Sequence, residues 1–267
     1  MPDSQHPLVK VQDLIVKYGE RTVLDGITTQ FNASEIRVIL GTSGCGKTTL
    51  LKSIIGLVKP FAGRVTLFDR EMKDPDEPET VKLLSKIGVL FQNGAMLGSL
   101  TVFDNIALPL NMHTQLHPKV IEEIVHTKLA QVDMPHAAYL FPGELSGGMR
   151  KRAALARSLV MDPSLLFCDE PSAGLDPVTS AGLDELLLKI RDILSITIVV
   201  VTHELMSIEK ISDKIIFLHK GKLLYDGLFD EARRIDSGPI ADFFARTEPA
   251  ENDTESSRLN LTVENII

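Results

Sequence analysis

The segment "GTSGCGKT", residues 41–48, has the residue types and the spacing needed to bind phosphate. Glycines let backbone N–H groups converge on phosphate oxygens, and a helix that begins behind them adds its positive end. Lys47 is expected to reach the β- and γ-phosphates, and Thr48 to place its hydroxyl on Mg²⁺. The predicted binding set for a nucleoside triphosphate is Gly41, Thr42, Ser43, Gly44, Cys45, Gly46, Lys47, Thr48 and Thr49.

Two adjacent carboxylates follow in the apolar run "LLFCDEP" and could turn nucleotide binding into hydrolysis. Phosphoryl transfer requires charge neutralisation and an oriented water, so we expect Asp169 to hold the Mg²⁺ shell and Glu170 to polarise the water. Gln92 and His203 also follow apolar runs, and ligands bind at the carboxyl ends of parallel strands, so both should point toward the γ-phosphate. The predicted catalytic residues are Glu170, His203, Lys47 and Gln92, and the predicted metal ligands are Thr48, Gln92 and Asp169.

A second glycine pair, in "LSGGM" at residues 145–149, opens directly onto another helix-like run. Ser146, Gly147 and Gly148 could form a second backbone anion site, with the serine as an added donor. The first loop already holds the triphosphate of its own domain, so the second loop must meet a different one. We therefore hypothesise a head-to-tail homodimer in which each "LSGGM" contacts the nucleotide bound by the other copy.

The periodicity around these motifs predicts an α/β fold. Residues 9–31 alternate apolar and polar residues around a Tyr-Gly turn, which is typical of antiparallel strands. The apolar runs "IRVILG", "IGVLFQN", "SLLFCDEP" and "ITIVVVTHE" predict further strands, and "IRVILG" is of the kind that is buried on both faces. The segment "KIIFLHKGKLLYDG" predicts a hairpin that turns at Lys220 and Gly221.

Predicted helices connect these strands. The run "KTTLLKSIIGL" has helical spacing and ends near Gly56, and Asp176 with Pro177 marks the start of a long amphipathic helix. The polar residues 70–80 predict a surface connection that leads into a short helix at 81–86. From 101 to about 160 only helical patterns occur, so this third of the chain is predicted to be a helical insertion.

Composition restricts the class of protein. With 267 residues and 44% hydrophobic content, the chain can bury a full core. The longest apolar stretch, 193–201, is too short to cross a bilayer and the N-terminus lacks the features of a signal peptide, so we expect a cytosolic protein. The net charge of -8 argues against a nucleic-acid surface, and the one dense basic run, 150–152, is expected to be a solvated helix face. Cys45 and Cys168 have no metal-ligand spacing and are expected to be buried filler.

These motifs, in this order, resemble those of the ATP-binding cassette (ABC) ATPases over residues 9–227. The resemblance implies ATP and Mg²⁺ as cofactors. It also implies a P-loop NTPase core with an N-terminal antiparallel β subdomain and a helical insertion subdomain. The implied organisation is one ABC ATPase domain at 8–246, with a nucleotide-binding core at 8–91 and 160–236, a Q-loop and helical subdomain at 92–159, and a C-terminal tail at 247–267.

The resemblance also suggests roles for single residues. Residues 41–48 resemble the Walker A loop, residues 145–149 the signature, and "LLFCDE" the Walker B strand with Glu170 as catalytic base. The other matches are Tyr18 with the aromatic residue that stacks on adenine, Gln92 with the Q-loop glutamine, Asp176 with the end of the D-loop, and His203 with the switch histidine.

Two positions depart from the family pattern. Met149 replaces the glutamine that commonly ends the signature, and Ser34 stands where many members have glycine. The stretch "FQNGAMLGSLTVFDNIALPL", with Met149 and Pro109, resembles the ATPases of Mla-type, Mce-associated phospholipid transporters of double-membrane bacteria and plastids. The residues leave open what Met149 changes and whether the ending "LNLTVENII" docks on a neighbour or frays.

This narrower resemblance implies ATP hydrolysis that powers phospholipid transport between the membranes of a double-membrane bacterium. The implied partners are a second copy of the chain, an MlaE-like integral membrane permease dimer, a STAS-domain protein and an Mce-type substrate-binding protein, without nucleic acid. The implied location is peripheral, on the cytoplasmic face of the inner membrane. Neither the lipid nor the direction of transport is implied.

Three other functions fit parts of the sequence. Amino-acid and metal importers share much of the subfamily pattern. Soluble ABC ATPases that act on chromosomes or ribosomes carry long coiled-coil insertions or a second cassette, and this sequence has neither. A nucleotide-binding switch without turnover is disfavoured by Glu170 and His203.

Overall fold

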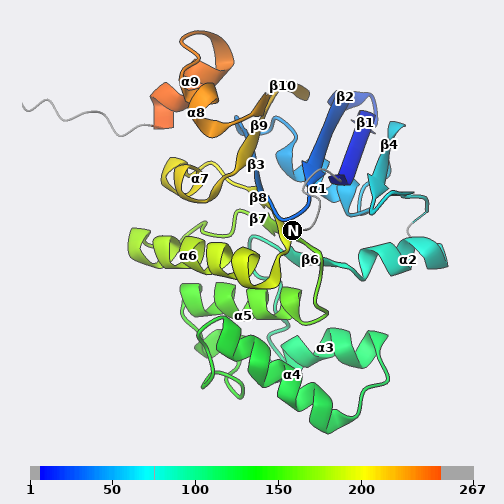
Figure 1. Cartoon of the computed structure of the whole chain (residues 1–267), viewed down its shortest axis with the longest axis vertical. Helices are drawn as coiled ribbons and strands as arrows, with labels where there is room; N and C mark the ends of the chain where they lie inside the picture. Colours follow the sequence, from blue (N-terminus) through cyan, green and yellow to red (C-terminus); the bar gives the residue numbers. More distant parts are fainter. Residues whose placement is uncertain (1–6, 75, 248–267) are drawn as a thin grey trace, which may run out of the picture.

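Two sheets organise the chain in a computed structural model that describes residues 7–74 and 76–247 (Figure 1). The first sheet is antiparallel, in the order β2-β1-β4-β5, and consists of β1 (Pro7–Tyr18), β2 (Arg21–Asn32), β4 (Ala62–Leu67) and β5 (Arg70–Glu71). The second sheet has the order β10-β9-β3-β8-β7-β6. It consists of β3 (Ile36–Gly41), β6 (Ile87–Leu90), β7 (Leu165–Asp169), β8 (Thr197–Val201), β9 (Lys214–His219) and β10 (Lys222–Gly227). Its strands are parallel except for β10, which pairs antiparallel with β9 at one edge.

The parallel sheet is covered on both faces. Every residue of β3, β7 and β8 is buried, as expected for strands without a solvent face. Along β3 the side chains alternate, with Val38 and Leu40 in one core and Ile39 in the other. The core around Ile39 includes the antiparallel sheet and α1 (Lys47–Ile54), and the other core includes the helices within residues 102–247.

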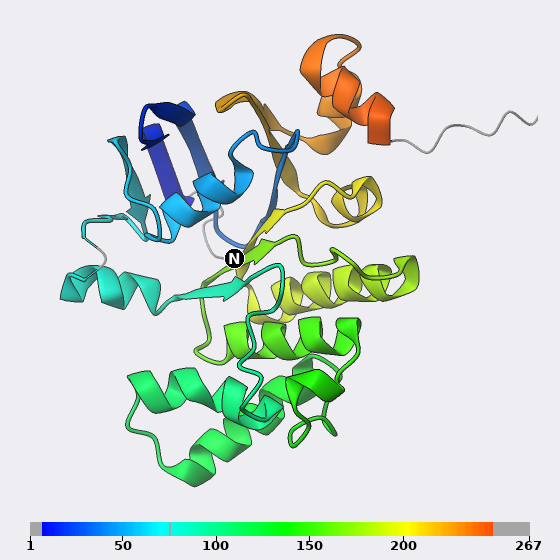
Figure 2. The ribbon, with the colours of Figure 1, turned by 180° about the vertical axis from the view of Figure 1, so that it is seen from behind.

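Most helices lie on the side of the parallel sheet that faces away from the antiparallel sheet, or beyond that side. The covering helices are α6 (Pro177–Leu194), α7 (Leu205–Ile211), α8 (Phe229–Arg233) and α9 (Gly238–Thr247). The insertion consists of α3 (Val102–His113), α4 (Pro118–Gln131), the 3-10 helix η1 (Pro142–Glu144) and α5 (Gly147–Leu159). Figures 1 and 2 show α3 and α4 at the end of the molecule opposite to the antiparallel sheet, with α5 between them and the rest.

These elements confirm the predicted α/β class, the N-terminal antiparallel sheet, the helical insertion and the hairpin at Lys220 and Gly221. The prediction for residues 70–86 was partly wrong. The connection contains the short strand β5, and helix α2 (Pro78–Leu84) begins three residues before 81 because Pro78 stands at a first-turn position with its φ already helical. The sequence pattern did not predict β4, α7, α8 or α9, because these elements pack against cores that are assembled from distant segments.

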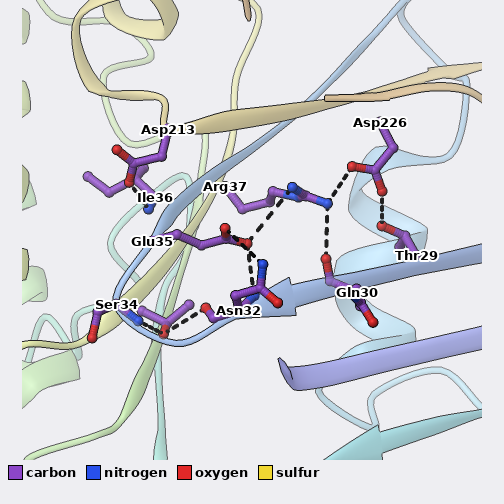
Figure 3. Close-up of polar contacts among 10 residues, drawn as sticks. Thr29, Gln30, Asn32, Ser34, Glu35, Ile36, Arg37, Asp213 and Asp226 are labelled. Carbon is purple, nitrogen blue, oxygen red and sulfur yellow. Dashed lines mark hydrogen bonds and ion pairs between the residues drawn. The ribbon is translucent and has the colours of Figure 1, made fainter. Parts of the chain in front are cut away.

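A polar network fixes the start of β3 against the neighbouring strands (Figure 3). Arg37 of β3 is 3% exposed and donates to the backbone oxygen of Gln30 in β2, at 3.0 Å, and to the carboxylate of Asp226 in β10. Asp226 also accepts a hydrogen bond from Thr29 of β2, at 2.8 Å. The strand that leads into the phosphate loop is therefore tied to both sheets.

Ser34 adopts a φ of 58°, in the region that favours glycine. Its backbone N–H donates to Thr197 Oγ1 at 2.8 Å (Figure 3), and its hydroxyl donates to the Ser195 oxygen at 3.0 Å. The turn therefore accepts serine, because two hydrogen bonds hold the strained backbone.

Within the part of the chain that the structure describes, no helix combines the length and the hydropathy required to cross a bilayer. Residues 248–267 lie outside the described residues. They include all but the first residue of the predicted tail and the ending "LNLTVENII".

Candidate active site

The phosphate loop lies between β3 and α1, in the strand–loop–helix order that the sequence predicted. Gly41 and Gly46 adopt φ values of 144° and 107°, which L side chains rarely adopt. A Cβ at Gly41 would lie 2.1 Å from the Leu218 oxygen, and one at Gly46 would lie 2.6 Å from Leu24 Cδ2. Glycine is therefore required at both positions, and no side chain there covers the backbone N–H groups of the loop.

Lys47, the first residue of α1, folds back over this loop. Its ammonium donates to the backbone oxygens of Gly41, at 2.8 Å, and of Thr42, at 3.3 Å. Both acceptors are neutral, whereas a phosphate oxygen carries charge and forms a stronger hydrogen bond with an ammonium. The lysine is thus held at the loop by bonds that a nucleotide can replace.

The remaining residues of the loop differ in exposure. Ser43 and Gly44 are exposed at its tip, Thr49 is partly buried in α1, and Cys45 is buried. Burial raises the pKa of the Cys45 thiol and also that of Cys168, so both are neutral small apolar groups. The prediction that the two cysteines are buried filler is confirmed, since both are free and buried.

Thr48 and Asp169 bring two oxygen donors together from α1 and the end of β7. The hydroxyl of Thr48 donates to Asp169 Oδ1 at 3.5 Å. Burial, followed by the nearby charge of Glu170, raises the pKa of Asp169 above its usual value. Mg²⁺ prefers oxygen ligands and usually takes only one or two from the protein, with substrate phosphates and water supplying the rest. The pair fits such an ion, and no cluster of three or more His, Cys, Asp or Glu residues exists in the described residues to serve as a closed metal cage.

Gln92, the third predicted metal ligand, lies two positions beyond β6 and is exposed. Its backbone oxygen accepts a hydrogen bond from Lys151. Within residues 7–74 and 76–247, no hydrogen bond joins the Gln92 side chain to Thr48 or Asp169. Its role as a ligand stays a prediction.

Glu170 and His203 form a pair beside the loop. Glu170 Oε1 lies 2.9 Å from His203 Nδ1, and the assignment of the proton depends on the histidine tautomer. Glu170 directly follows β7 and has a φ of 46°, unusual for a residue other than glycine, while its N–H donates to the Val201 oxygen at 2.8 Å. Its second carboxylate oxygen, Oε2, is buried and accepts no hydrogen bond from any described residue. The carboxylate is therefore oriented through one oxygen and has a free acceptor at the other.

The phosphate loop, Glu170 and His203 line one cavity of about 710 Å³. The sequence predicted this meeting of distant segments, because all of them follow strands of the parallel sheet. The cavity is also lined by residues that the sequence pattern did not predict, namely His219 and Lys220 at the β9–β10 turn and Pro239, Asp242 and Phe243 of α9. The turn was predicted, but nothing in its pattern indicated that β9 lies beside β3 and brings it to the loop.

The second glycine pair stands at the start of α5. Ser146 is the N-cap of this helix, and its hydroxyl oxygen accepts a hydrogen bond from the Met149 N–H at 3.2 Å. Ser146 and Gly148 line a separate cavity of about 490 Å³ that shares no residue with the cavity of the phosphate loop. A single chain therefore does not bring its two glycine loops into one site.

Asp176 and Tyr18 occupy surface positions. Asp176 caps α6, since its Oδ1 accepts from the N–H groups of Val178 and Thr179 at 3.1 and 3.0 Å. The hydroxyl of Thr179 donates to its Oδ2, and these bonds lower the pKa of Asp176. Tyr18 ends β1 and is 52% exposed, so its ring is available to a ligand.

The predicted solvated face at residues 150–152 was wrong for two of its three members. Arg150 is exposed, but Lys151 is 7% exposed and donates to the backbone oxygens of Gln92 and Glu170. Arg152 is partly buried and pairs with Asp133 at 2.9 Å. The helical period could have revealed this, because Lys151 stands three and four positions before fully buried residues of α5.

The Lys47 ammonium, the Thr48–Asp169 pair and the Glu170–His203 pair thus meet at the carboxyl edge of one parallel sheet. Fold and site together define a P-loop ATPase of the ATP-binding cassette class. The ABC transporter family model matches residues 24–173, more than half of the chain. The chain belongs to this family and contains its ATP-binding domain.

Named relatives cover most of the chain. The "Intermembrane phospholipid transport system ATP-binding protein MlaF" of Escherichia coli is 38% identical over 228 residues, which are 85% of this chain and 84% of that protein. The "Probable ribonucleotide transport ATP-binding protein mkl" of Mycobacterium tuberculosis is 39% identical over 219 residues, which are 82% of this chain but only 61% of that protein. The chain thus spans about three fifths of the mycobacterial relative.

A solved structure with the same fold is a dimeric ATP-binding cassette in a post-hydrolysis state, bound to ADP and Pi. It is 29% identical, covers 82% of this chain and 98% of its own chain, and has a TM-score of 0.75.

Proposed function

We propose that this chain is the ATP-hydrolysing subunit of an ABC transporter that moves phospholipid between the membranes of a double-membrane bacterium through a separate permease. The observation that carries the hydrolytic part is the Glu170–His203 pair in the cavity of the phosphate loop. The cargo is supported by the similarity to MlaF, which extends over most of both chains.

Each side chain of the cavity has a role in this proposal. Lys47 exchanges its two loop carbonyls for phosphate oxygens and stabilises the charge that develops on the γ-phosphate. Glu170 polarises the attacking water through its carboxylate, while His203 holds Oε1 and fixes the direction of the carboxylate. The water is thereby oriented for attack on the γ-phosphate.

Mg²⁺ is the second proposed cofactor. Thr48 and Asp169 would hold it, with Gln92 as a further candidate ligand. When bound, the ion neutralises phosphate charge. Tyr18 is proposed to stack on the adenine, because its ring is exposed at the end of β1.

The active form is proposed to be a head-to-tail homodimer. In it, Ser146, Gly147 and Gly148 of one copy contact the nucleotide on the loop of the other, and Asp176 lies at the same interface. The two separate cavities of the single chain support this arrangement, as does the dimeric cassette with the same fold. The domain is proposed to extend over 8–246, with its core at 8–91 and 160–236, the partner-contacting subdomain at 92–159 and a tail at 247–267.

The proposed partners follow the MlaF-like reading. They are an MlaE-like permease dimer, a STAS-domain protein and an Mce-type substrate-binding protein, and the chain is proposed to be peripheral on the cytoplasmic face of the inner membrane. A pull-down of the tagged chain from detergent-solubilised native membranes, with mass spectrometry of proteins and lipids, tests this assignment. Recovery of an Mce-type protein and phospholipid is expected. Recovery of an amino-acid, metal or nucleotide permease instead would overturn the lipid cargo and leave the ATPase assignment standing.

Hydrolysis has its own test. Phosphate release from ATP by the purified chain is expected to require Mg²⁺, and a chain that binds ATP without turnover would be a switch rather than a motor.

A further inference from the structure

Lys151 joins two segments that lie far apart in the sequence. It stands one turn into α5, the helix behind the second glycine pair, and its ammonium donates to the backbone oxygens of Gln92 and Glu170. The first acceptor follows β6, and the second follows β7, at 3.1 Å from the ammonium. One side chain thus connects the start of the helical insertion, the proposed catalytic glutamate and helix α5.

The environment of Lys151 is costly for a cation. Its direct hydrogen-bond partners are neutral backbone oxygens, and no ion pair with a carboxylate involves it among the described residues. Burial lowers the pKa of Lys151, although nearby negative groups that include Glu170 oppose this effect. Burying a charge without a paired carboxylate is unfavourable, and an apolar side chain of similar length would avoid that cost.

Lys128 shows what a buried lysine looks like without such a link. It is 5% exposed, similar to Lys151, but it lies on α4 within the helical insertion, and its ammonium pairs with the carboxylate of Asp162. Its partner is an exposed surface residue that the proposed chemistry does not use. The two lysines therefore share their burial and differ in what they hold.

Arg157, a second cation of α5, holds the segment that follows Gln92 but forms no hydrogen bond with Glu170 among the described residues. Arg157 donates to the backbone oxygens of Gly94, at 2.8 Å, and Ala95, at 2.6 Å. The segment from Gln92 to Ala95 is thus fastened to α5 twice, whereas the Glu170 backbone is fastened to α5 by Lys151.

The backbone of Glu170 needs such support. Its φ of 46° is unfavourable for a residue other than glycine, and its carboxylate direction depends on this backbone. The N–H on one side is held by the Val201 oxygen, and the carbonyl on the other side accepts from Lys151 at 3.1 Å and from the Ala173 N–H, within its own turn, at 3.2 Å. Without Lys151, this carbonyl keeps only the bond within its own turn, and its link to α5 is lost.

We infer that Lys151 is a positioning residue for hydrolysis, which fixes the backbone of Glu170 and the chain at Gln92 to the same helix. The inference rests on the proposed role of Glu170. Helix α5 carries the second glycine pair at its start, so the aim of the carboxylate depends on where that helix lies. Displacement of α5 or of the Gln92 segment is then transmitted to the water-polarising group through one side chain.

The test compares Lys151→Met with Lys128→Met in the full chain, kept in the complex with which it co-purifies. We expect Lys151→Met to bind ATP within about twofold of the unsubstituted chain and to hydrolyse it with a kcat lower by tenfold or more, since a misplaced catalytic group costs on the order of 10- to 100-fold. Lys128→Met is expected to keep its kcat and to change only the unfolding midpoint. A merely structural role of Lys151 would lower the unfolding midpoint in the same way without separating kcat from ATP affinity.

A wild-type kcat in folded Lys151→Met would overturn the inference. If that variant does not fold, Lys151→Gln replaces it, because the amide keeps its donors but is one atom too short to span both carbonyls. A reduced kcat with unchanged ATP affinity is expected for this variant, and an unchanged kcat would overturn the inference. Absence of hydrolysis by the unsubstituted complex would instead contradict the proposed function.

Discussion

The two glycine loops of this chain look alike in sequence and differ in structure. Each precedes a helix, α1 or α5, and each contains small residues that leave backbone N–H groups accessible. The first loop leaves a fully buried strand and shares its cavity with Glu170 and His203. The second leaves the 3-10 helix η1 and lies in a cavity with neither. Only the first loop shares a cavity with candidate catalytic side chains of the same chain.

Glycine has a different purpose in each loop. Gly41 and Gly46 have positive φ values, and a Cβ added at either position would collide with neighbouring backbone or side-chain atoms. Gly148 lies in the regular first turn of α5, and its constraint is space, because a Cβ there would lie 2.5 Å from the Thr179 methyl carbon. A glycine pair therefore indicates a close approach, and only the surrounding structure tells whether the approach is to a ligand or to another helix.

The largest expected effect is the loss of hydrolysis at the first loop without loss of binding. Glu170→Gln removes the group that polarises water, and kcat for phosphate release should fall by on the order of 10²- to 10⁴-fold. ATP affinity, measured by fluorescent nucleotide titration, should stay within about threefold because the phosphate loop is unchanged. Glu185→Gln, which removes an exposed carboxylate paired with Lys210, is the control and should hydrolyse normally.

The same variant tests whether the second loop depends on another copy. Sedimentation equilibrium of Glu170→Gln should give a monomer without ATP and a dimer with it, since the nucleotide is bound but not consumed. A mass that does not respond to ATP would contradict the head-to-tail dimer and would leave the second glycine pair without a ligand.

The next effect is the loss of nucleotide affinity. Lys47→Ala removes a charge-assisted hydrogen bond to phosphate, so the affinity for ATP should fall by about 10- to 100-fold. Lys59→Ala, at an exposed lysine beyond the end of α1, should bind normally. Full affinity in Lys47→Ala would show that the loop backbone alone binds the phosphates.

Gly148→Ala should affect the second loop through packing. The added methyl group would collide with Thr179, so we expect the free energy of unfolding to fall by about 1–3 kcal/mol, measured by urea denaturation. The double variant Gly148→Ala with Thr179→Ser removes the clashing carbon and keeps the hydroxyl bonded to Asp176, so most of the stability should return. No recovery would mean that the glycine is needed for another reason.

The smallest effect is expected for Ser146→Ala. Loss of the N-cap of α5 should lower the free energy of unfolding by about 0.5–2 kcal/mol. Ser146→Asn keeps a capping side chain and should restore that stability. In a Glu170→Gln background, the alanine variant should also weaken the ATP-dependent dimer seen by sedimentation. An unchanged dimer would mean that the Ser146 hydroxyl caps the helix but does not contribute to the proposed contact with the nucleotide of the other copy.

Local chemistry explains what could be predicted for the site. The glycine spacing of residues 41–46, the lysine behind it and the carboxylates after an apolar strand each reflect a requirement within a few residues. Lys151 was misread because three adjacent cations suggest a solvated surface, and the burial of the middle one depends on the Gln92 and Glu170 carbonyls that arrive from distant strands.

By itself the sequence determined the strand–loop–helix around Lys47, the α/β alternation, the helical insertion and the candidate chemistry of Asp169, Glu170 and His203, because hydrophobic period and glycine geometry act over short distances. Only the tertiary structure decided that Glu170 Oε1 faces His203, that β9 and α9 border the phosphate loop and that the two glycine loops open into separate cavities. These facts depend on the order of strands in the sheet, which is set by long-range packing against two cores.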